Sequence, residues 1–356
     1  MKIAIITDIH FGARNNAEFF LNHYEKFFRE VFFPRLEKEG ITDVLLLGDT
    51  WEERKTLNAN TLDRARKMFF DPLMAKNIKV KVIYGNHDVF YKDTNDVNMV
   101  DLIGDLYPNV HVVKTHEVFN FDGLNIGMIS WINKENLAES LEWMNTVDAP
   151  YLCGHFEIRS FQMIKGQVCE HGFEKSQFER FERVFSGHFH YMSDDGRICY
   201  VSNPFQTNWS DYGLDKGFRI LDTETRELET VKNPFELYEK VVVREDVDLL
   251  KFNYEGFQDK FVKVYVKSFG DVNQHKIALF THELGKYAYQ ISVEEIDETL
   301  VGSLTDDGEF DYADTVTVIE EYIKSVVNPD SNVDKVRLKS IFMALYNEAA
   351  NMSLSE

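Results

Sequence analysis

Short runs of apolar and β-branched residues recur along the first 200 residues, and most of them end in polar side chains. They cover residues 2–6, 44–47, 79–84, 125–130, 150–153 and 183–186. Runs of this length predict buried β-strands. Between the first two runs, phenylalanines at near-helical spacing from Phe19 onward predict a long amphipathic helix that ends at Gly40. Alternating strands and helices indicate an α/β domain, in which ligands gather beyond the carboxyl ends of the strands.

The pattern changes after Cys199 to strands with little helix between them. Runs at 197–201, 218–222 and 226–232 are expected to complete the first domain, and Asn233-Pro234 marks a boundary. The next section predicts a small α+β domain, with strands over 239–243, 261–268 and 287–293 and a helix over 272–285. We therefore expect two folded domains, covering residues 1–232 and 233–303.

Residues 304–314 form an acidic stretch that we interpret as a linker, and two helices are predicted within 315–352. In the first of them Val316, Ile319 and Ile323 lie on one apolar stripe. Such a face must be buried, either against the chain's own domain or against a partner protein. The pattern alone leaves these two possibilities open.

The composition is that of a folded protein that is not exported. Hydrophobic residues make up 44% of the chain, which has 29 Phe and only 7 Pro. Its three cysteines have no CxxC spacing and indicate neither a disulfide framework nor a thiolate zinc site. The residues MKIAII lead directly into Thr7, Asp8 and His10 without the apolar region of a signal peptide, so we expect no secretory leader. No apolar stretch is as long as a membrane span. We expect a cytoplasmic protein without a membrane partner.

The net charge of -21 argues against a nucleic-acid partner, because binding to phosphates normally depends on Lys and Arg. The uneven distribution of the charge along the chain weakens this argument. Residues 1–200 carry 23 Lys and Arg against 30 Asp and Glu, whereas residues 201–356 carry 16 against 30. Most of the acidic excess is therefore C-terminal. Residues 54–81 are locally basic, so this segment could face a phosphate backbone or could be an ordinary solvated surface. The candidate DNA contacts within it are Arg54, Lys55, Arg64 and Lys67.

Five short segments with metal-ligand side chains follow the predicted strands. They are Asp8-Ile9-His10, Gly48-Asp49, Gly85-Asn86-His87-Asp88, Gly154-His155 and Gly187-His188-Phe189-His190. One such segment could be a turn or a helix cap, but five of them at strand ends indicate one shared site. Mixed carboxylate, imidazole and amide donors suit Mn²⁺, Fe²⁺ or Zn²⁺.

Seven of these side chains are candidate metal ligands: Asp8, His10, Asp49, Asn86, His155, His188 and His190. Seven donors are too many for one ion but fit two ions if one carboxylate bridges them, and Asp49 is the natural bridge. Two cations roughly 3.5–4 Å apart neutralise a phosphate, activate a bound water and stabilise the transition state of phosphoryl transfer. The constellation therefore predicts two-metal phosphoester hydrolysis.

His87 lies next to a candidate ligand but is not needed as one. It is our candidate for the group that protonates the leaving oxygen or stabilises its charge. The adjacent Asp88 is predicted to orient the imidazole of His87.

The same segments resemble the DxH, GD, GNH[DE], single His and GHxH motifs of the calcineurin-like metallophosphoesterase superfamily, over the first 225 residues. Within it, the stretches GHFEIRSFQMIKG, VFSGHFH and YVSNPFQTNWSDYGLDKGFRILDTET are most similar to the SbcD-like nuclease subunits of DNA double-strand-break repair. The shorter bacteriophage recombination endonuclease subunits are especially similar. The resemblance implies a four-layer α/β/β/α sandwich with a small capping domain and C-terminal helices.

The resemblance also implies roles for individual residues. One metal would be held by Asp8, His10, Asp49 and His190, and the other by Asp49, Asn86, His155 and His188. His87 would act in catalysis. Manganese is the implied metal, with magnesium, iron and zinc as alternatives.

The partners implied by the resemblance are DNA and an SMC-like coiled-coil ATPase that binds the helices in 315–352. A homodimer is implied through segments 57–70 and 94–106, with Leu57, Leu62, Met68, Phe69, Met99, Leu102 and Leu106 as candidate contacts. A phage-encoded chain would work in the cytoplasm of its bacterial host. The chain departs from the family in Thr50-Trp51-Glu52-Glu53, where relatives often have an apolar residue and then Asp.

The expected function is a metal-dependent DNA nuclease, an exonuclease or endonuclease that acts at DNA ends in recombination and double-strand-break repair. One alternative is a phosphoesterase that acts on a small molecule or a protein. Another is a catalytically inactive scaffold of the same fold. The additional domains favour the nuclease over a small-substrate hydrolase, and the presence of every ligand position and His87 disfavours the scaffold.

Overall fold

The computed structural model describes residues 1–244, 247–267 and 274–296, together with Arg337. The chain divides into two compact units, one of residues 1–207 and 213–235 and one of residues 208–212 and those from 236 onward. This division falls three residues beyond the predicted domain boundary, and it assigns the short segment 208–212 to the second unit. The predicted acidic linker and the predicted helices in 315–352 lie outside the described residues, except for Arg337.

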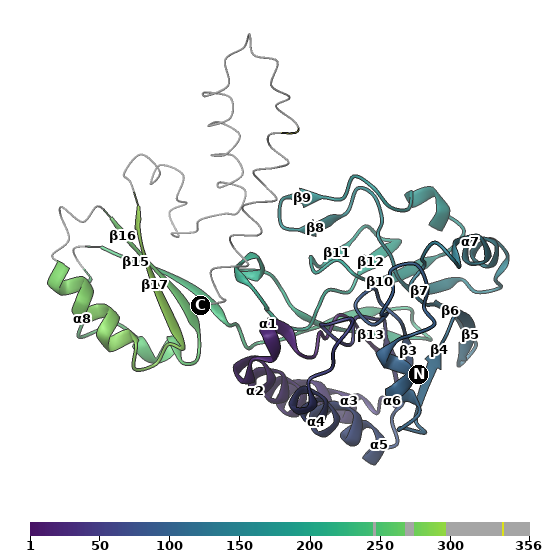
Figure 1. The fold of residues 1–356 in the computed structure, drawn as a ribbon, viewed down its shortest axis with the longest axis horizontal. Coiled ribbons are helices and arrows are strands. Elements are labelled where there is room, and N and C mark those ends of the chain that lie inside the picture. The colour runs from purple at the N-terminus through teal and green to yellow at the C-terminus, as the bar shows by residue number, and fades with distance from the viewer. Residues whose placement is uncertain (245–246, 268–273, 297–336, 338–356) are drawn as a thin grey trace, which may run out of the picture. The chain divides into compact units, whose positions relative to one another are not determined.

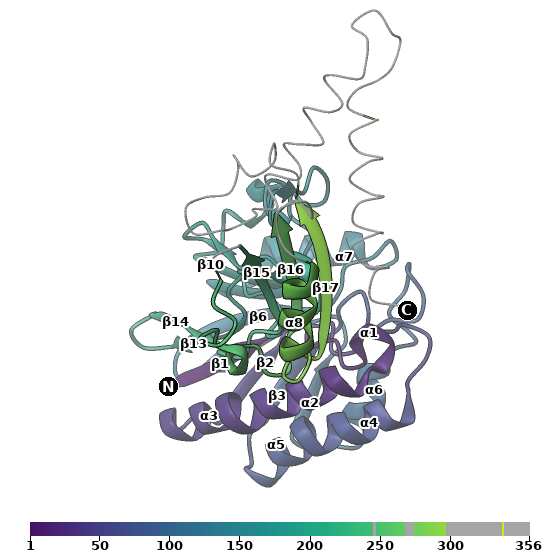
Figure 2. The ribbon, with the colours of Figure 1, turned by 90° about the vertical axis from the view of Figure 1, so that its left-hand side faces the viewer.

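Two six-stranded sheets form the first unit (Figures 1 and 2). The first sheet comprises, in order, β14 (Leu228–Lys232), β13 (Gly217–Asp222), β1 (Lys2–Ile6), β2 (Asp43–Leu46), β3 (Lys79–Ile83) and β4 (Val110–Val113). The second comprises β11 (Ser193–Asp194), β12 (Ile198–Tyr200), β10 (Arg183–Gly187), β7 (Tyr151–His155), β6 (Leu124–Ile129) and β5 (His116–Phe121). Strands β1 to β4 are parallel to one another, as are β6, β7, β10 and β12. Antiparallel pairing occurs toward the sheet edges: β5 and β11 are edge strands, whereas β13 lies between the edge strand β14 and β1 and is antiparallel to both.

The remaining elements of this unit are helices, short helical turns and one hairpin. The helices are α1 (Ala13–Asn16), α2 (Glu18–Phe27), α3 (Phe33–Glu39), α4 (Ala59–Ala65), α5 (Asp71–Ala75), α6 (Met99–Gly104) and α7 (Leu137–Thr146). The hairpin consists of β8 (Gln162–Ile164) and β9 (Gln167–Val168), and η3 (Lys175–Phe178) is a 3-10 turn. The sequence pattern predicted the central strands but missed β4, β5, β8, β9 and β11, which are short or are exposed on one side.

The long helix expected from Phe19 to Gly40 is interrupted by a π-helical turn, η1 (Phe28–Phe32), between α2 and α3. A second π-helical turn, η2 (Arg66–Phe70), joins α4 to α5. Each turn precedes a proline at the start of the next helix, Pro34 or Pro72. Proline lacks the N–H donor and clashes with the carbonyl four residues earlier, and a wider turn relieves that clash.

Apolar side chains fill the space between the two sheets and cover their outer faces. Between the sheets, Ile5 and Leu45 pack in one buried cluster with Ile126 and Phe185. The outer face of the first sheet packs against aromatic side chains of the α2–η1 segment, and the Phe32 ring lies 5.0 Å from that of Phe218 in β13. On the outer face of the second sheet a separate buried cluster includes residues of α7. The unit is therefore an α/β/β/α sandwich, and the predicted fold class is confirmed.

The second unit contains a three-stranded parallel sheet in the order β15 (Tyr238–Val243), β16 (Phe261–Lys267) and β17 (Gln290–Ile296). It also contains α8 (Gln274–Leu284) and the 3-10 turns η4 (Trp209–Asp211) and η5 (Tyr254–Phe257). Ile277 and Phe280 of α8 pack with Val243 and Val264 of the sheet. Nowhere among the described residues is there a helix long and apolar enough to cross a bilayer.

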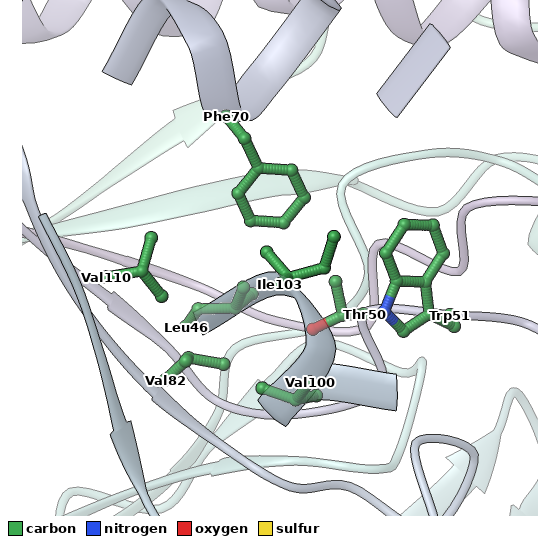
Figure 3. Close-up of a pocket in the computed structure, with 8 residues that line it drawn as sticks. All are labelled: Leu46, Thr50, Trp51, Phe70, Val82, Val100, Ile103 and Val110. Carbon is green, nitrogen blue, oxygen red and sulfur yellow. The ribbon is translucent and has the colours of Figure 1, made fainter. Parts of the chain in front are cut away.

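A small cavity lies beneath the segment that follows Asp49 (Figure 3). Its lining is mostly apolar and consists of Leu46, Thr50, Trp51, Phe70, Val82, Val100, Ile103 and Val110. Trp51 is only 1% exposed, and its ring lies 5.7 Å from that of Phe11. Apolar packing of Trp51 thus fixes the chain immediately after Asp49.

Candidate metal centre

The five predicted ligand segments lie at the carboxyl ends of five strands, three in the first sheet and two in the second. Asp8 follows β1, Asp49 follows β2, Asn86 follows β3, His155 ends β7, and His188 and His190 follow β10. Because the strands within each sheet run parallel here, their carboxyl ends meet at the same edge. The structure brings all seven predicted ligands together where these two edges meet.

Four of these residues have an unusual backbone conformation. The φ angle is 50° at Asp8, 52° at His10, 48° at Asp49 and 85° at His188. Non-glycine residues in this left-handed region cost on the order of 1–3 kcal/mol each and persist where the surrounding structure holds them. The strain is therefore concentrated at one site, as is common where side chains must be aimed at a ligand.

The glycines before two of the ligands are required by close contacts. A Cβ atom on Gly85 would lie 2.2 Å from Asp49 Oδ1, and one on Gly187 would lie 2.2 Å from Thr7 Oγ1. Neither neighbour can move without disturbing a candidate ligand, because Thr7 Oγ1 also donates a hydrogen bond to Asp8 Oδ2 at 2.7 Å. Because glycine has no Cβ, Gly85 can approach the Asp49 segment and Gly187 can approach the segment that contains Thr7 and Asp8.

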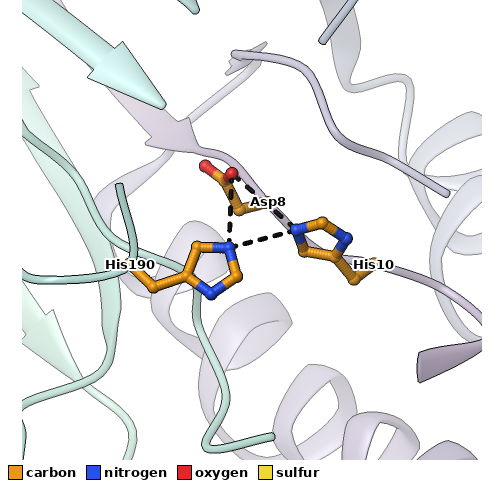
Figure 4. Close-up of side chains that lie close together, drawn as sticks. All are labelled: Asp8, His10 and His190. Atoms are coloured by element: carbon orange, nitrogen blue, oxygen red, sulfur yellow. Dashed lines mark hydrogen bonds and ion pairs between the residues drawn. The ribbon is translucent and has the colours of Figure 1, made fainter. Parts of the chain in front are cut away.

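Asp8, His10 and His190 form the first ligand group (Figure 4). His10 Nε2 lies 3.1 Å from His190 Nε2. Asp8 Oδ1 lies 3.8 Å from the His10 nitrogen and 3.6 Å from the His190 nitrogen. The backbone N–H of His188 donates to both Asp8 oxygens at 3.1 Å and fixes the plane of this carboxylate.

Asp49, His155 and His188 form the second group, and Asn86 lies with them. Asn86 Oδ1 lies 3.1 Å from His155 Nε2 and 2.8 Å from His188 Nδ1. Asp49 Oδ2 lies 3.3 Å from His155 Nε2 and 3.8 Å from His10 Nε2. One oxygen of Asp49 thus faces both groups, which is the position that a bridging ligand needs.

These side chains fit divalent cations. The donors are carboxylate oxygens, an amide oxygen and imidazole nitrogens, the set preferred by Mn²⁺, Fe²⁺ and Zn²⁺. Two imidazole nitrogens 3.1 Å apart, both directed toward one carboxylate, form a geometry suited to sharing a cation. Asp8, His10, Asp49 and His190 would hold one ion, and Asp49, Asn86, His155 and His188 the other.

The buried charges at this centre shift the pKa values of its members strongly. Burial opposes the charged form of His10, but Glu52, Asp49 and Asp8 raise its pKa to about 10. Burial likewise opposes protonation of His155, whose pKa Asp49 and Asp8 raise to about 9. Despite burial, His155 and His190 lower the pKa of Asp8 to about 2, and the pKa of Asp49 is lowered by His155 and His10. In the metal-free protein, protons on His10 and His155 thus balance the buried carboxylates.

Metal binding at this centre is expected to tighten as the pH rises. The raised pKa values of His10 and His155 mean that a cation must displace protons from both rings at neutral pH. The apparent affinity should then increase up to about pH 9–10, by at most about tenfold per pH unit for each proton displaced. Calorimetric titration with Mn²⁺ at several pH values, in buffers of different ionisation enthalpy, would measure both affinity and proton release. An affinity that does not change with pH would contradict this expectation.

His87 lies beside the two ligand groups and is held by its neighbours. Its backbone N–H donates to Asp49 Oδ1 at 2.7 Å, and its Nδ1 lies 2.6 Å from the carbonyl oxygen of Glu52. A carbonyl oxygen only accepts, so Nδ1 is the donor in this contact. This leaves Nε2 of His87 for proton transfer, and the ring lies 5.0 Å from that of His10.

The partners of Asp88 differ from those predicted. Its carboxylate accepts backbone hydrogen bonds from Thr50 and Trp51 through Oδ1 and from Gly85 through Oδ2. The ring of His87 is instead oriented by the carbonyl of Glu52. Asp88 is fully buried, so its hydrogen bonds join the Asp49 segment to the Asn86 segment. Its adjacency to His87 in the sequence could not reveal this, because successive side chains of a tight turn diverge.

Two further residues of the site were not among the sequence predictions. The Glu52 carboxylate lies 2.8 Å from His10 Nδ1, at the distance of an ion pair. The ring of Trp131, just beyond β6, lies 5.8 Å from that of His155 and 5.6 Å from that of His188. In the sequence, Glu52 stands out only as part of a departure from the family motif, and no local signal indicates a role for Trp131.

Replacing Glu52 by glutamine is expected to weaken metal binding by about 10- to 100-fold, the usual effect of removing a carboxylate that orients a ligating histidine. The charge of Glu52 fixes Nδ1 of His10 as a donor and leaves Nε2 for a cation. The control is Glu53→Gln, because the exposed neighbour Glu53 accepts from Thr56 instead. Equal Mn²⁺ affinity in the two variants would show that Glu52 has no positioning role.

Four of the eight basic side chains in the segment 54–81 are paired with acidic side chains. Arg64 binds Glu18 and Glu25, at 2.9 and 2.6 Å, and Lys67 binds Asp63 at 2.7 Å. Lys76 and Lys81 pair with Glu37 and Asp43 respectively. Of the four predicted DNA contacts, Arg64 and Lys67 are therefore largely neutralised. Arg54 and Lys55 have no ion pair among the described residues, and they lie close to Glu52 in the sequence.

The sequence and the fold were compared with known proteins. The family model described as calcineurin-like phosphoesterase matches residues 1–192. Exonuclease subunit 1 of Enterobacteria phage T4 is 30% identical over 351 residues, which cover 98% of this chain and 99% of the phage protein.

The solved structures that match this chain include a phosphodiesterase from an archaeon and a hypothetical protein from Thermus thermophilus. The archaeal protein has a TM-score of 0.33 and 14% identity, and the match covers 65% of this chain and all of that one. The Thermus protein has a TM-score of 0.36 and 13% identity, and the match covers 65% of this chain and 97% of that one.

Proposed function

This chain belongs to the calcineurin-like phosphoesterase family and is a metal-dependent phosphodiesterase, and from this premise we propose that its substrate is DNA. The proposal is a two-metal deoxyribonuclease that cuts phosphodiester bonds at DNA ends in recombination and double-strand-break repair, with manganese as the metal. It rests on the alignment with the phage exonuclease subunit, which extends beyond the metal centre over nearly the whole chain.

The observation that carries the catalytic part of the proposal is the position of Asp49. Its Oδ2 atom faces the ring nitrogens of both ligand groups, while its Oδ1 atom holds the backbone of His87. A single carboxylate thus ties the proposed metal ligands to the proposed proton donor. This is the geometry that phosphodiester hydrolysis requires, because the leaving oxygen must be protonated close to the bound phosphate.

In the proposed mechanism, the two divalent ions that the seven candidate ligands would hold would neutralise the phosphate and supply a nucleophilic water near neutral pH. The protein contributes the orientation of the reacting groups. Its Asp8 and Asp49 carboxylates are held as anions, and Glu52 holds both His10 and His87. His87 in its protonated form donates from Nε2 to the leaving oxygen, while its Nδ1 stays bonded to the Glu52 carbonyl.

The test is hydrolysis of end-labelled linear DNA and of a generic phosphodiester by the purified protein with Mn²⁺, with and without chelator. We expect cleavage of both that is abolished by chelator. Hydrolysis of the small ester but never of DNA, even with an SMC-like ATPase subunit supplied, would overturn the DNA proposal. The same reaction with Mg²⁺, Fe²⁺ and Zn²⁺ would test manganese as the metal.

Arg54 and Lys55 are the proposed phosphate contacts near the site. The Arg54→Ala/Lys55→Ala double variant should weaken DNA binding by the same factor for all DNA sequences. The slope of the logarithm of DNA affinity against the logarithm of salt concentration, called here the salt slope, should become shallower by about two, one for each lost phosphate contact. Lys67→Ala is the matched control, because that ammonium already pairs with Asp63. Salt titrations of DNA binding by fluorescence anisotropy measure both effects. A salt slope equal to that of Lys67→Ala would exclude Arg54 and Lys55 as contacts.

The proposed protein partner is an SMC-like ATPase that binds the predicted helices in 315–352. This proposal is supported by the similarity to an exonuclease subunit over 98% of the chain. A homodimer through the first unit is also proposed. Met68, Phe69 and Met99 are buried in the chain's own core, whereas Leu102 and Leu106 are 60% and 57% exposed. Leu57 and Leu62 are half-buried. The proposed dimer contact therefore retains these two residues together with Leu102 and Leu106. A monomeric mass in solution at micromolar concentration would contradict it.

A further inference from the structure

A separate group of metal-ligating side chains lies in the segment 156–173, which leaves the sheet directly after β7 and contains the β8–β9 hairpin (Figure 1). It consists of Glu157, Cys169 and His171. Cys169 Sγ lies 4.0 Å from Glu157 Oε1, and His171 Nε2 lies 2.9 Å from the same oxygen. The three donor atoms all lie within 4.8 Å of one another.

Backbone hydrogen bonds hold the two arms of this segment together. The N–H of Phe173 donates to the Glu157 carbonyl at 2.8 Å, and the N–H of Arg159 donates to the Phe173 carbonyl at 3.0 Å. The N–H of Ser160 donates to the Cys169 carbonyl at 2.9 Å. The main chain itself therefore places Glu157 opposite Cys169 and His171, although twelve residues separate the glutamate from the cysteine.

The chemistry and exposure of the three donors suit one ion of intermediate softness. Thiolate, imidazole and carboxylate together are the donor types of Zn²⁺, whereas Mn²⁺ and Mg²⁺ rarely take thiolate. Cys169 is 1% exposed, while the side chains of Glu157 and His171 are 30% and 70% exposed. An ion here would have a buried sulfur on one side and a position open to water on the other.

We propose that Glu157, Cys169 and His171 bind a single Zn²⁺ ion as a clip that joins the two arms of the segment 156–173. Zn²⁺ would displace the thiol proton and close a loop whose first residues follow the candidate ligand His155. The ion would stabilise the folded segment, because a cross-link between its two arms restricts the chain more than the backbone hydrogen bonds do alone. The site differs from the two-metal centre in containing sulfur, and it does not depend on the proposed nuclease activity.

The test uses Co²⁺ as a spectroscopic substitute for Zn²⁺, added to the full chain. None of the seven donors at the two-metal centre is a thiolate, and the other two cysteines, Cys153 and Cys199, are buried in the core between the sheets. In the folded chain a sulfur-to-cobalt charge-transfer band therefore reports on the proposed clip. We expect the band to reach the intensity of one thiolate-bound Co²⁺ per chain, after the two-metal centre has also been filled, and to disappear when Zn²⁺ is added. Absence of the band at any Co²⁺ concentration that keeps the protein folded would overturn the proposal.

Three variants make the assignment specific. Cys169→Ser should abolish the band, and His171→Ala should weaken Co²⁺ binding by at least about tenfold, as expected when a metal loses part of its coordination. The exposed His171 can be replaced without disturbing the fold. The control His111→Ala removes another exposed histidine, one paired with Glu117, and should leave the band unchanged. A band that persists in Cys169→Ser, or an affinity equal in the two histidine variants, would overturn the site.

Discussion

Replacing His87 by alanine is expected to lower turnover by about 10²- to 10⁴-fold, the range for loss of a positioned general acid, while the protein keeps its metals. The imidazole is held by Asp49 at its backbone N–H and by the Glu52 carbonyl at Nδ1. Neither contact makes His87 one of the seven candidate ligands. Its removal should therefore lower the rate of the chemical step without emptying the site.

The measurement combines steady-state cleavage rates with the metal content of the purified variant. His111→Ala is the control for loss of an imidazole, since His111 is exposed and pairs with Glu117. A second comparison uses a substrate with a leaving group that needs no proton, for which the defect should be much smaller. A His87→Ala variant that cleaves DNA at a near wild-type rate would remove this residue from the mechanism.

Asp49→Asn is expected to lower activity by at least about 10³-fold, the upper end of the effect of losing one electrostatic contact in a catalytic site, and to weaken binding of both metals. The amide keeps an oxygen that can accept from the His87 N–H. It removes the negative charge that Oδ2 presents to His10 and His155. Because one oxygen faces both ligand groups, the substitution should affect both ions together.

The control is Asp43→Asn, at the opposite end of β2, where Asp43 pairs with Lys81. It tests whether loss of any carboxylate from this strand destabilises the sheet. Metal stoichiometry and DNA cleavage would be measured for both variants. If Asp49→Asn bound one metal with unchanged affinity, Asp49 would be a ligand of the other ion alone and not the bridge.

The sequence predicted the elements that are periodic and buried. Strands β1, β2, β3, β6, β7 and β10 are close to the predicted runs, because strands covered on both faces are almost continuously apolar. Short or half-exposed strands such as β5 lack that continuous apolar pattern, and their polar side chains are equally typical of loops. The interruption of the first long helix was also missed, because the apolar spacing continues through η1 and only Pro34 marks the change.

The candidate site was predicted in part. The seven candidate ligands, which the structure brings together, could be named because donor residues recur after apolar runs, often preceded by glycine. Glu52 could not be assigned, since its contact with His10 depends on how the loop after Asp49 folds back. Asp88 was given the wrong contact for the same reason. Charge density suggested Arg64 and Lys67 as DNA contacts, but their acidic partners Glu18, Glu25 and Asp63 appear only in the folded chain.

By itself, the sequence determined the chemistry of this protein. The types of donor, their order after the strands and the pairing of Gly with a ligand depend on local residues, and together they indicate two divalent ions and phosphoester hydrolysis. Only the tertiary structure decided which groups act together. It placed Asp49 between both ligand groups, assigned the orientation of His87 to Glu52, and brought Glu157 to Cys169 and His171. Each of these contacts joins residues whose separation in the sequence carries no information about their distance in space, because that distance is set by how the sheets and loops pack.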